Sequence, residues 1–156
     1  MHQVAVAWIW MVIAGFAILP AAVDASSEDQ VVRGVVESFL TRLGDRQYDT
    51  LASDFTPKAI IVVTRQRDGQ WTNSYQTAEE WIETLKRNPN PVAFREPIAN
   101  VQVTIDSDQL AYLRADFQVV RDGHALSKGV DQFTLVREHN VWKIAMVAYT
   151  SLPAAP

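Results

Sequence analysis

The sequence contains no cysteine, which excludes disulfide bridges, zinc–thiolate sites and thiol nucleophiles. Its 3 histidines, His2, His124 and His139, are not spaced as the paired ligands of a metal site. A glycine-rich phosphate loop is missing, and no serine stands in a nucleophile-elbow pattern. From these absences we expect neither a metal nor a cofactor.

Positive charge is also scarce. The chain has 14 Lys and Arg against 18 Asp and Glu, a net charge of −4 and a pI near 5.3. Nucleic-acid-binding proteins usually present a basic face, so we expect no nucleic-acid partner. A composition that is 48% hydrophobic and 21% charged is typical of a globular protein and excludes disorder.

The first part of the chain has the pattern of a leader. No charged residue occurs between Val4 and Ala22, and the small residues of Val23-Asp24-Ala25 follow. This order predicts a signal peptide, residues 1–25, and export to the periplasm or medium with no membrane contact after cleavage. Because Met1-His2-Gln3 lacks Lys and Arg, an uncleaved anchor is the alternative, with the domain still outside the cytoplasm. One domain, 26–152, and a tail, 153–156, would remain.

Helical periodicity follows the leader. Apolar residues from Val31 to Leu43 recur every three or four positions, which predicts an amphipathic helix. Ser27 and Gln30 have capping-box spacing at its start, and Gly44 suits a left-handed residue at its end. Similar patterns predict a short helix over 48–55 and a third after Thr77 and Glu80, a second capping-box pair.

Alternating apolar residues predict the strands. They begin with 59–64 and 71–75, joined by a turn at Asp68-Gly69, and continue through 101–105, 111–119, 132–135 and 142–146. In the last of these we expect Trp142, Ile144 and Met146 to share one face. The predicted order is ααββαββββ, an α+β domain in which a curved antiparallel sheet wraps three helices.

Two stretches carry a family resemblance. The run 39–45 with Leu51 to Phe55 and Pro57, and the ending 129–133 with 141–144, resemble the nuclear transport factor 2-like superfamily over residues 28–152. That superfamily includes ketosteroid isomerase, scytalone dehydratase, SnoaL-type cyclases and many non-enzymatic binders. The resemblance implies a cone that encloses a pocket. It says little about function, because one fold hosts unrelated chemistries.

The ketosteroid isomerase machinery is incomplete in this chain. The resemblance places its oxyanion-stabilising acid at Asp131, but its tyrosine falls at Phe39 and its general base near Val63. An acid without a base cannot remove and return a proton. Steroid isomerisation is therefore disfavoured.

Asp131 is the leading candidate site residue. Strand alternation places it on the same face as Phe133 and Leu135, so it should point inward, where burial raises the pKa of a carboxyl. It could orient or protonate a ligand. Alternatively, backbone amides or an arginine such as Arg65 could hold it as a structural carboxylate.

Other candidates are weaker. Trp71 and Tyr75 share a strand face and could contact a ligand at the pocket mouth, or simply pack. Glu96 could line the pocket or its rim, and the adjacent Pro97 leaves its direction open.

Three functions remain open. They are an exported domain that binds a small apolar ligand, a SnoaL-type lyase or isomerase using Asp131, and an interaction module with a filled pocket. A ligand pocket needs roughly 300 Å³ or more. A second titratable group beside Asp131 would favour the enzyme. Apolar residues expected on the outer sheet face also predict a homodimer: Tyr112, Val120, Val136, Val147 and Tyr149.

Overall fold

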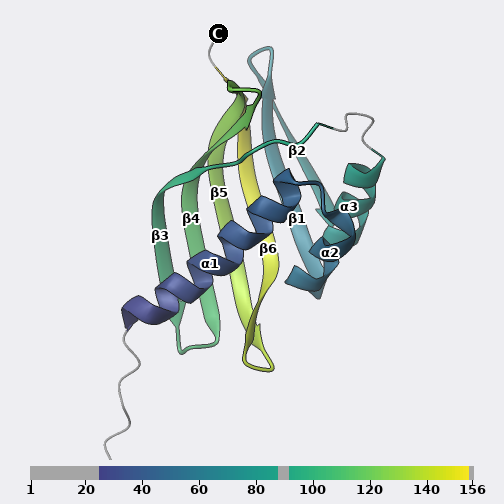
Figure 1. Cartoon of the computed structure of the whole chain (residues 1–156). Helices are drawn as coiled ribbons and strands as arrows, with labels where there is room; N and C mark the ends of the chain where they lie inside the picture. Colours follow the sequence, from purple (N-terminus) through teal and green to yellow (C-terminus); the bar gives the residue numbers. More distant parts are fainter. Residues whose placement is uncertain (1–24, 88–91, 155–156) are drawn as a thin grey trace, which may run out of the picture.

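The computed structural model describes residues 25–87 and 92–154 and has the predicted α+β order (Figure 1). The helices are α1 (Ala25–Gly44), α2 (Tyr48–Leu51) with the 3₁₀ turn η1 (Ala52–Asp54), and α3 (Ala78–Lys86). The strands are β1 (Phe55–Arg67), β2 (Gln70–Thr77), β3 (Ile98–Asp106), β4 (Leu110–Arg121), β5 (His124–Glu138) and β6 (Val141–Pro153). The predicted leader, apart from Ala25, lies outside the described residues. None of the described helices has the length and apolarity needed to cross a bilayer.

The six strands form one curved sheet in the order β2-β1-β6-β5-β4-β3. The prediction of a wholly antiparallel sheet is wrong in one place, because β1 and β6 run parallel, with Ile61 opposite Val147. The other neighbouring strands are antiparallel. Turn residues predict the pairing only of strands that are consecutive in sequence. β1 and β6 are the first and last strands of the domain, so no turn joins them.

Tight turns set the register of the hairpins. Asp68-Gly69, Asp122-Gly123 and His139-Asn140 each have two residues with φ between 49° and 77°. Such turns match the twist of the strands that they join. The first turn therefore pairs Arg67 with Gln70 and determines which face of β2 lies inside.

A bulge in β6 reverses the expected alternation. Thr134 pairs with Met146 but Leu135 pairs with Ile144, so one extra residue is inserted between them. Trp142 and Ile144 are buried as predicted, but Met146 is exposed and Val147 is buried. The predicted facing of Met146, Val147 and Tyr149 is therefore wrong, because one inserted residue moves all later side chains to the opposite face.

The helix ends also differ from the prediction. α1 already includes Ser27, so the Ser27–Gln30 pair does not start it. Gly44 does not have a positive φ; Arg46 does, at 62°. Thr77 and Glu80 do form the predicted capping box at α3, with Thr77 N donating to Glu80 Oε2 at 2.8 Å.

The core lies between α1, α3 and the inner face of the sheet. Phe39 is at its centre and makes edge-on contacts with Phe55 and Phe133, at centroid distances of 5.4 and 5.9 Å. At the lower end, Glu28 of α1 binds Arg137 and accepts a hydrogen bond from Trp142 Nε1. These contacts hold α1 against the sheet, and Phe39 and Phe133 also line a cavity.

Candidate functional site

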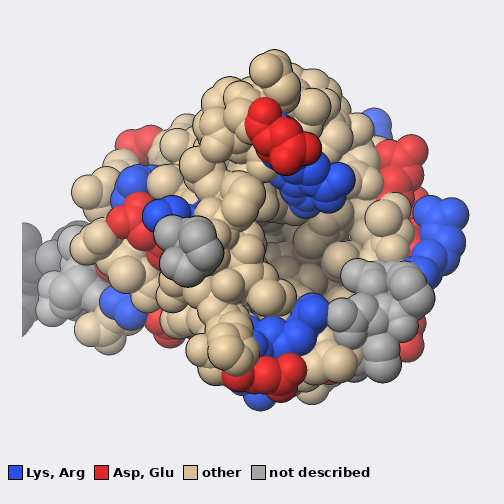
Figure 2. All heavy atoms as spheres, turned by 90° about the horizontal axis from the view of Figure 1, so that it is seen from above, with Lys and Arg blue, Asp and Glu red and all other residues tan. Residues whose placement is uncertain are grey.

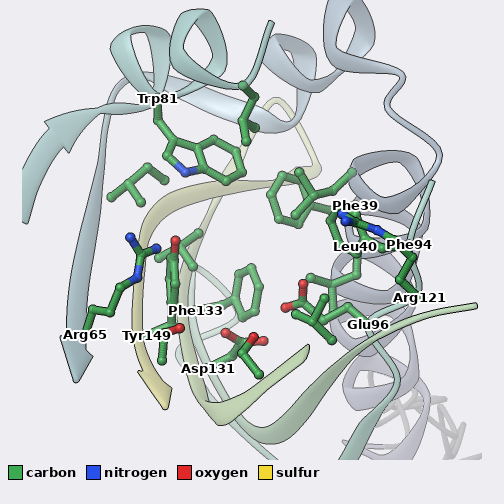
Figure 3. A pocket seen from close by; sticks show the side chains of 17 residues that line it. Phe39, Leu40, Arg65, Trp81, Phe94, Glu96, Arg121, Asp131, Phe133 and Tyr149 are labelled. Atoms are coloured by element: carbon green, nitrogen blue, oxygen red, sulfur yellow. The ribbon is translucent and has the colours of Figure 1, made fainter. Parts of the chain in front are cut away.

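A cavity of about 210 Å³ lies inside the cone (Figure 3). Seen from the end that holds the β1–β2 hairpin, the molecule is hollowed at its centre (Figure 2). The cavity is smaller than the roughly 300 Å³ of typical ligand pockets, but larger than the roughly 150 Å³ that admits benzene. It is lined by Phe39, Leu40, Leu43, Ile61, Arg65, Trp81, Leu85, Phe94, Glu96, Val119, Arg121, Ser127, Asp131, Phe133, Val147, Tyr149 and Ser151.

Aromatic rings from three elements form the apolar wall. Phe39 comes from α1, Trp81 from α3 and Phe133 from β5. The rings of Phe39 and Trp81 stack at a centroid distance of 6.2 Å, and Phe39 meets Phe133 edge-on. Such a wall accommodates a flat or compact hydrocarbon group.

A carboxyl pair lies in the cavity. Asp131 is only 2% exposed, and its carboxyl group points toward that of Glu96, with which it shares a hydrogen bond (Figure 3). The other carboxyl oxygen of Asp131, Oδ2, has no partner among the described residues. The structure therefore contradicts the alternative prediction that an arginine such as Arg65 holds this carboxylate.

The two groups perturb one another. Burial, followed by the charge and hydrogen bond of Glu96, raises the pKa of Asp131 to about 8. Burial raises the pKa of Glu96 to about 7, and the hydrogen bond from Asp131 opposes this rise. Two carboxyl groups so close together cannot readily both ionise, so the pair retains a shared proton at neutral pH.

Backbone pairing directs Glu96 into the cavity. Arg95 forms two backbone hydrogen bonds with Val120 of β4, at 2.9 and 2.8 Å, and Pro97 O accepts one from Gln118. Arg95 extends outward to Asp45 at 2.6 Å, so its neighbour Glu96 points inward. The sequence did not predict the direction of the Glu96 side chain, because Pro97 follows it directly. The pairing of Arg95 with Val120 of β4 fixes that direction.

Tyr149 supplies a hydroxyl group to the same cavity. Trp81 donates a hydrogen bond to Tyr149, whose pKa burial raises and the charge of Arg65 partly lowers. The phenol therefore stays protonated and keeps its own proton available to donate. Sequence reasoning missed Tyr149, because the β6 bulge that turns it inward has no turn residue to mark it.

Two arginines lie toward the open end. Arg65 and Arg121 line the cavity from opposite sides (Figure 3). Ser127 of β5 and Ser151 of β6 also line it, and Ser151 is paired with Arg65 in the sheet. The Nε of Arg121 is buried without a hydrogen-bond partner among the described residues. Arg65 thus shares the cavity with Asp131 but does not pair with it.

Trp71 and Tyr75 lie elsewhere. Their side chains are 50% and 71% exposed, and neither lines the cavity. The hairpin register pairs Trp71 with Gln66, whereas Arg65, which faces the cavity, pairs with Thr72. The expectation that Trp71 and Tyr75 lie at the pocket mouth is therefore wrong. The two-residue turn at Asp68-Gly69 already contained the information needed to exclude them.

Metal ligands do not cluster in the described part of the chain. No group of three or more His, Asp or Glu side chains there is arranged to hold an ion. The side chains that line the cavity include carboxyl, hydroxyl and guanidinium groups.

Known structures share this fold. The β subunit of a candidate aromatic-ring-hydroxylating dioxygenase from Novosphingobium aromaticivorans matches with a TM-score of 0.67 at 11% identity, covering 84% of this chain and 93% of that one. A candidate scytalone dehydratase from the same organism matches with a TM-score of 0.62 at 11% identity, covering 81% and 85%. An NTF2-like protein of unknown function from Pseudomonas putida matches with a TM-score of 0.61 at 11% identity, covering 81% and 87%.

At these identities the likeness concerns the fold alone. No curated protein matches the sequence. A family model does match, the SnoaL-like domain, over residues 24–148 and therefore over most of the chain. The protein belongs to the SnoaL-like domain family and has an NTF2-like fold.

Proposed function

We propose that this protein catalyses proton transfer on a small organic substrate held in the cavity, as an isomerase or a lyase. The observation that carries the proposal is the carboxyl pair in the cavity, formed by the buried Asp131 and the partly buried Glu96. A pair that shares one proton near neutral pH contains both a base and an acid in the same place. Such a pair, buried at a cost in stability and open to a cavity, suits catalysis better than structural support.

The residues suggest how the reaction proceeds. The ionised member of the pair removes a proton from a carbon next to a carbonyl group, and the electrons of that C–H bond move toward the carbonyl oxygen. Tyr149 donates a hydrogen bond to this oxygen as its charge develops. Return of the proton to another carbon completes an isomerisation. In an elimination, the protonated carboxyl group instead gives its proton to the departing group.

Two other predicted functions fit the site less well. A cavity of about 210 Å³ weighs against an interaction module whose pocket its own side chains fill. Binding without turnover does not require two carboxyl groups that share a proton. The similarity to a candidate scytalone dehydratase is compatible with a lyase, but it reflects the fold and not the site.

Deuterium exchange tests the proposal. Cyclohexanone and acetophenone are small enough for the cavity and carry hydrogens next to a carbonyl group, and proton NMR in D₂O follows the loss of those hydrogens. We expect exchange above the buffer rate, fastest between about pH 7 and 8, where the pair holds one proton. Asp131→Asn should lower the enzymatic rate by about 100-fold or more, the usual contribution of an acid–base group.

The control is Glu79→Gln, which alters an exposed carboxylate in the first turn of α3 and should leave the rate unchanged. Binding of either ketone without exchange would indicate a binding protein. Equal rates for the protein and for Asp131→Asn would exclude the carboxyl pair as the catalytic group.

A further inference from the structure

We propose that the open end of the cavity is an anion subsite, in which Arg65 and Arg121 hold the carboxylate of a small substrate whose remaining body is apolar. This inference deepens the proposed function, because it names the substrate class on which the acid pair would act. The subsite itself can exist without turnover, so the two can be tested separately.

The arginines are placed at one end of the cavity by the strands that carry them. Arg65 lies two residues before the end of β1, and Arg121 is the last residue of β4. Both line the cavity, and their side chains enter it from opposite sides (Figure 3). Basic side chains flank the central hollow in the space-filling view (Figure 2). Ser127 and Ser151 add hydroxyl groups at the same end.

Neither arginine has an anionic partner within the described residues. Arg33, Arg42, Arg95, Arg114 and Arg137 form ion pairs with carboxylates, but Arg65 and Arg121 do not. Arg121 Nε is moreover buried without a hydrogen-bond acceptor among the described residues. Arg42 and Arg137 also have such an Nε, but each binds a carboxylate through its other nitrogens, whereas Arg121 has no such ion pair. A buried donor without a partner is costly, and the carboxylate of a ligand would provide the acceptor.

The charge of the cavity specifies the class of ligand. Arg65 and Arg121 supply two positive charges, and a carboxyl pair that shares one proton supplies one negative charge. One positive charge remains, and a monoanion neutralises it. Guanidinium groups bind carboxylates through parallel hydrogen bonds, so a monocarboxylate suits these two side chains.

The size and wall of the cavity restrict the rest of the ligand. The space beyond the arginines is lined by rings and aliphatic side chains, among them Phe39, Trp81 and Phe133. Because about 150 Å³ holds the six carbons of benzene, about 210 Å³ holds roughly eight or nine non-hydrogen atoms. A carboxylate with a ring or a short unsaturated chain has this size.

Benzoate and benzamide test the subsite, because they have the same shape and differ in charge. Isothermal titration at pH 7 should show that benzoate binds at least about tenfold more tightly than benzamide, the effect expected of charge-assisted hydrogen bonds. Arg65→Gln and Arg121→Gln should each weaken benzoate binding about tenfold and leave benzamide binding unchanged. Unchanged benzamide binding also shows that a variant is folded.

The matched control is Arg67→Gln, which removes an exposed arginine two residues along the same strand and should leave both affinities unchanged. Equal affinities for benzoate and benzamide, or an equal loss in Arg67→Gln, would overturn the subsite. Benzoate has no hydrogen on a carbon next to its carboxylate, so its binding is independent of proton transfer. If ketone exchange is seen but benzoate binds no more tightly than benzamide, the anion subsite alone is refuted. If benzoate binds as expected but no ketone exchange is seen, the proposed reaction alone is refuted.

Discussion

At the scale of single residues, the Asp131–Glu96 pair is the unusual feature of this molecule. Ordinary carboxyl groups ionise below pH 5, but burial raises the pKa of both members well above that range, and the charge and hydrogen bond of Glu96 raise that of Asp131 further. No arginine compensates Asp131, although Arg65 lines the same cavity. The pair therefore lowers the stability of the folded protein at neutral and higher pH, as functional groups often do.

The pH dependence of the melting temperature tests whether Asp131 and Glu96 have raised pKa values. Between about pH 4 and 8 the folded state binds more protons than the unfolded state, so the stability contributed by these groups is complete below pH 4 and is lost as the pH rises. We expect the melting temperature to fall by about 5 °C or more from pH 5 to pH 8.5. Asp131→Asn, which cannot ionise, should reduce this fall and melt higher than the original protein at pH 8.5.

Calorimetric scans of both proteins at the two pH values measure the effect. Glu79→Gln, on the exposed side of α3, should keep the full pH dependence. The same fall in melting temperature for Asp131→Asn and the original protein would show that the pair does not titrate as described.

At the scale of the elements, the close approach of α1 to the segment before β3 positions Glu96. Phe94 N donates a hydrogen bond to Gly44 O at 3.0 Å, and Arg95 binds Asp45. A Cβ atom on Gly44 would lie 2.4 Å from Phe94 O, which is too close for any side chain. Gly44 thus matters for backbone contact and not for a left-handed conformation, which Arg46 adopts instead.

Two glycines of α1 provide a matched pair of substitutions. Gly44→Ala should destabilise the fold by about 1–3 kcal/mol, because the backbone at Phe94 must move. Gly34→Ala, in the same helix, meets nothing within 4 Å and should stabilise it by about 0.5–1 kcal/mol through helix propensity. Urea unfolding gives both values. Equal effects of the two changes would contradict the contact between Gly44 and Phe94.

At the scale of the whole molecule, the outer sheet face carries exposed apolar side chains. Tyr112, Thr134, Met146 and Ile60 lie opposite one another across neighbouring strands. Tyr112, Met146 and Ile60 are 36–43% exposed. Trp71 and Tyr75, excluded from the cavity, extend the same face at the edge strand β2. We propose that this face forms the predicted homodimer, since a second copy would cover it.

Sedimentation velocity tests the dimer. The protein should sediment as a dimer at micromolar concentration, and Tyr112→Lys should shift it toward monomer because a charge at the centre of an apolar interface is costly. Val141→Lys, at an exposed position beside the His139-Asn140 turn, should leave the dimer intact. A monomer at high micromolar concentration would exclude this interface.

The sequence alone determined what depends on neighbouring residues. Helical periodicity and turn residues yielded the order of the elements, and strand alternation correctly placed Asp131 inside with Phe133. These features depend on local sterics and on the periodicity of apolar residues, both of which can be read within a single segment. The leader and export remain predictions of the same kind.

Only the tertiary structure decided which residues meet. Glu96 turns inward because Arg95 pairs with Val120 of a distant strand, and Tyr149 turns inward because a bulge in β6 shifts its register. β1 joins β6 in parallel, a pairing that no turn encodes. The carboxyl pair, the phenol and the two arginines come together through contacts between segments far apart in sequence. Local pattern says nothing about such contacts, because their energies depend on burial and pairing that exist only once the chain has folded.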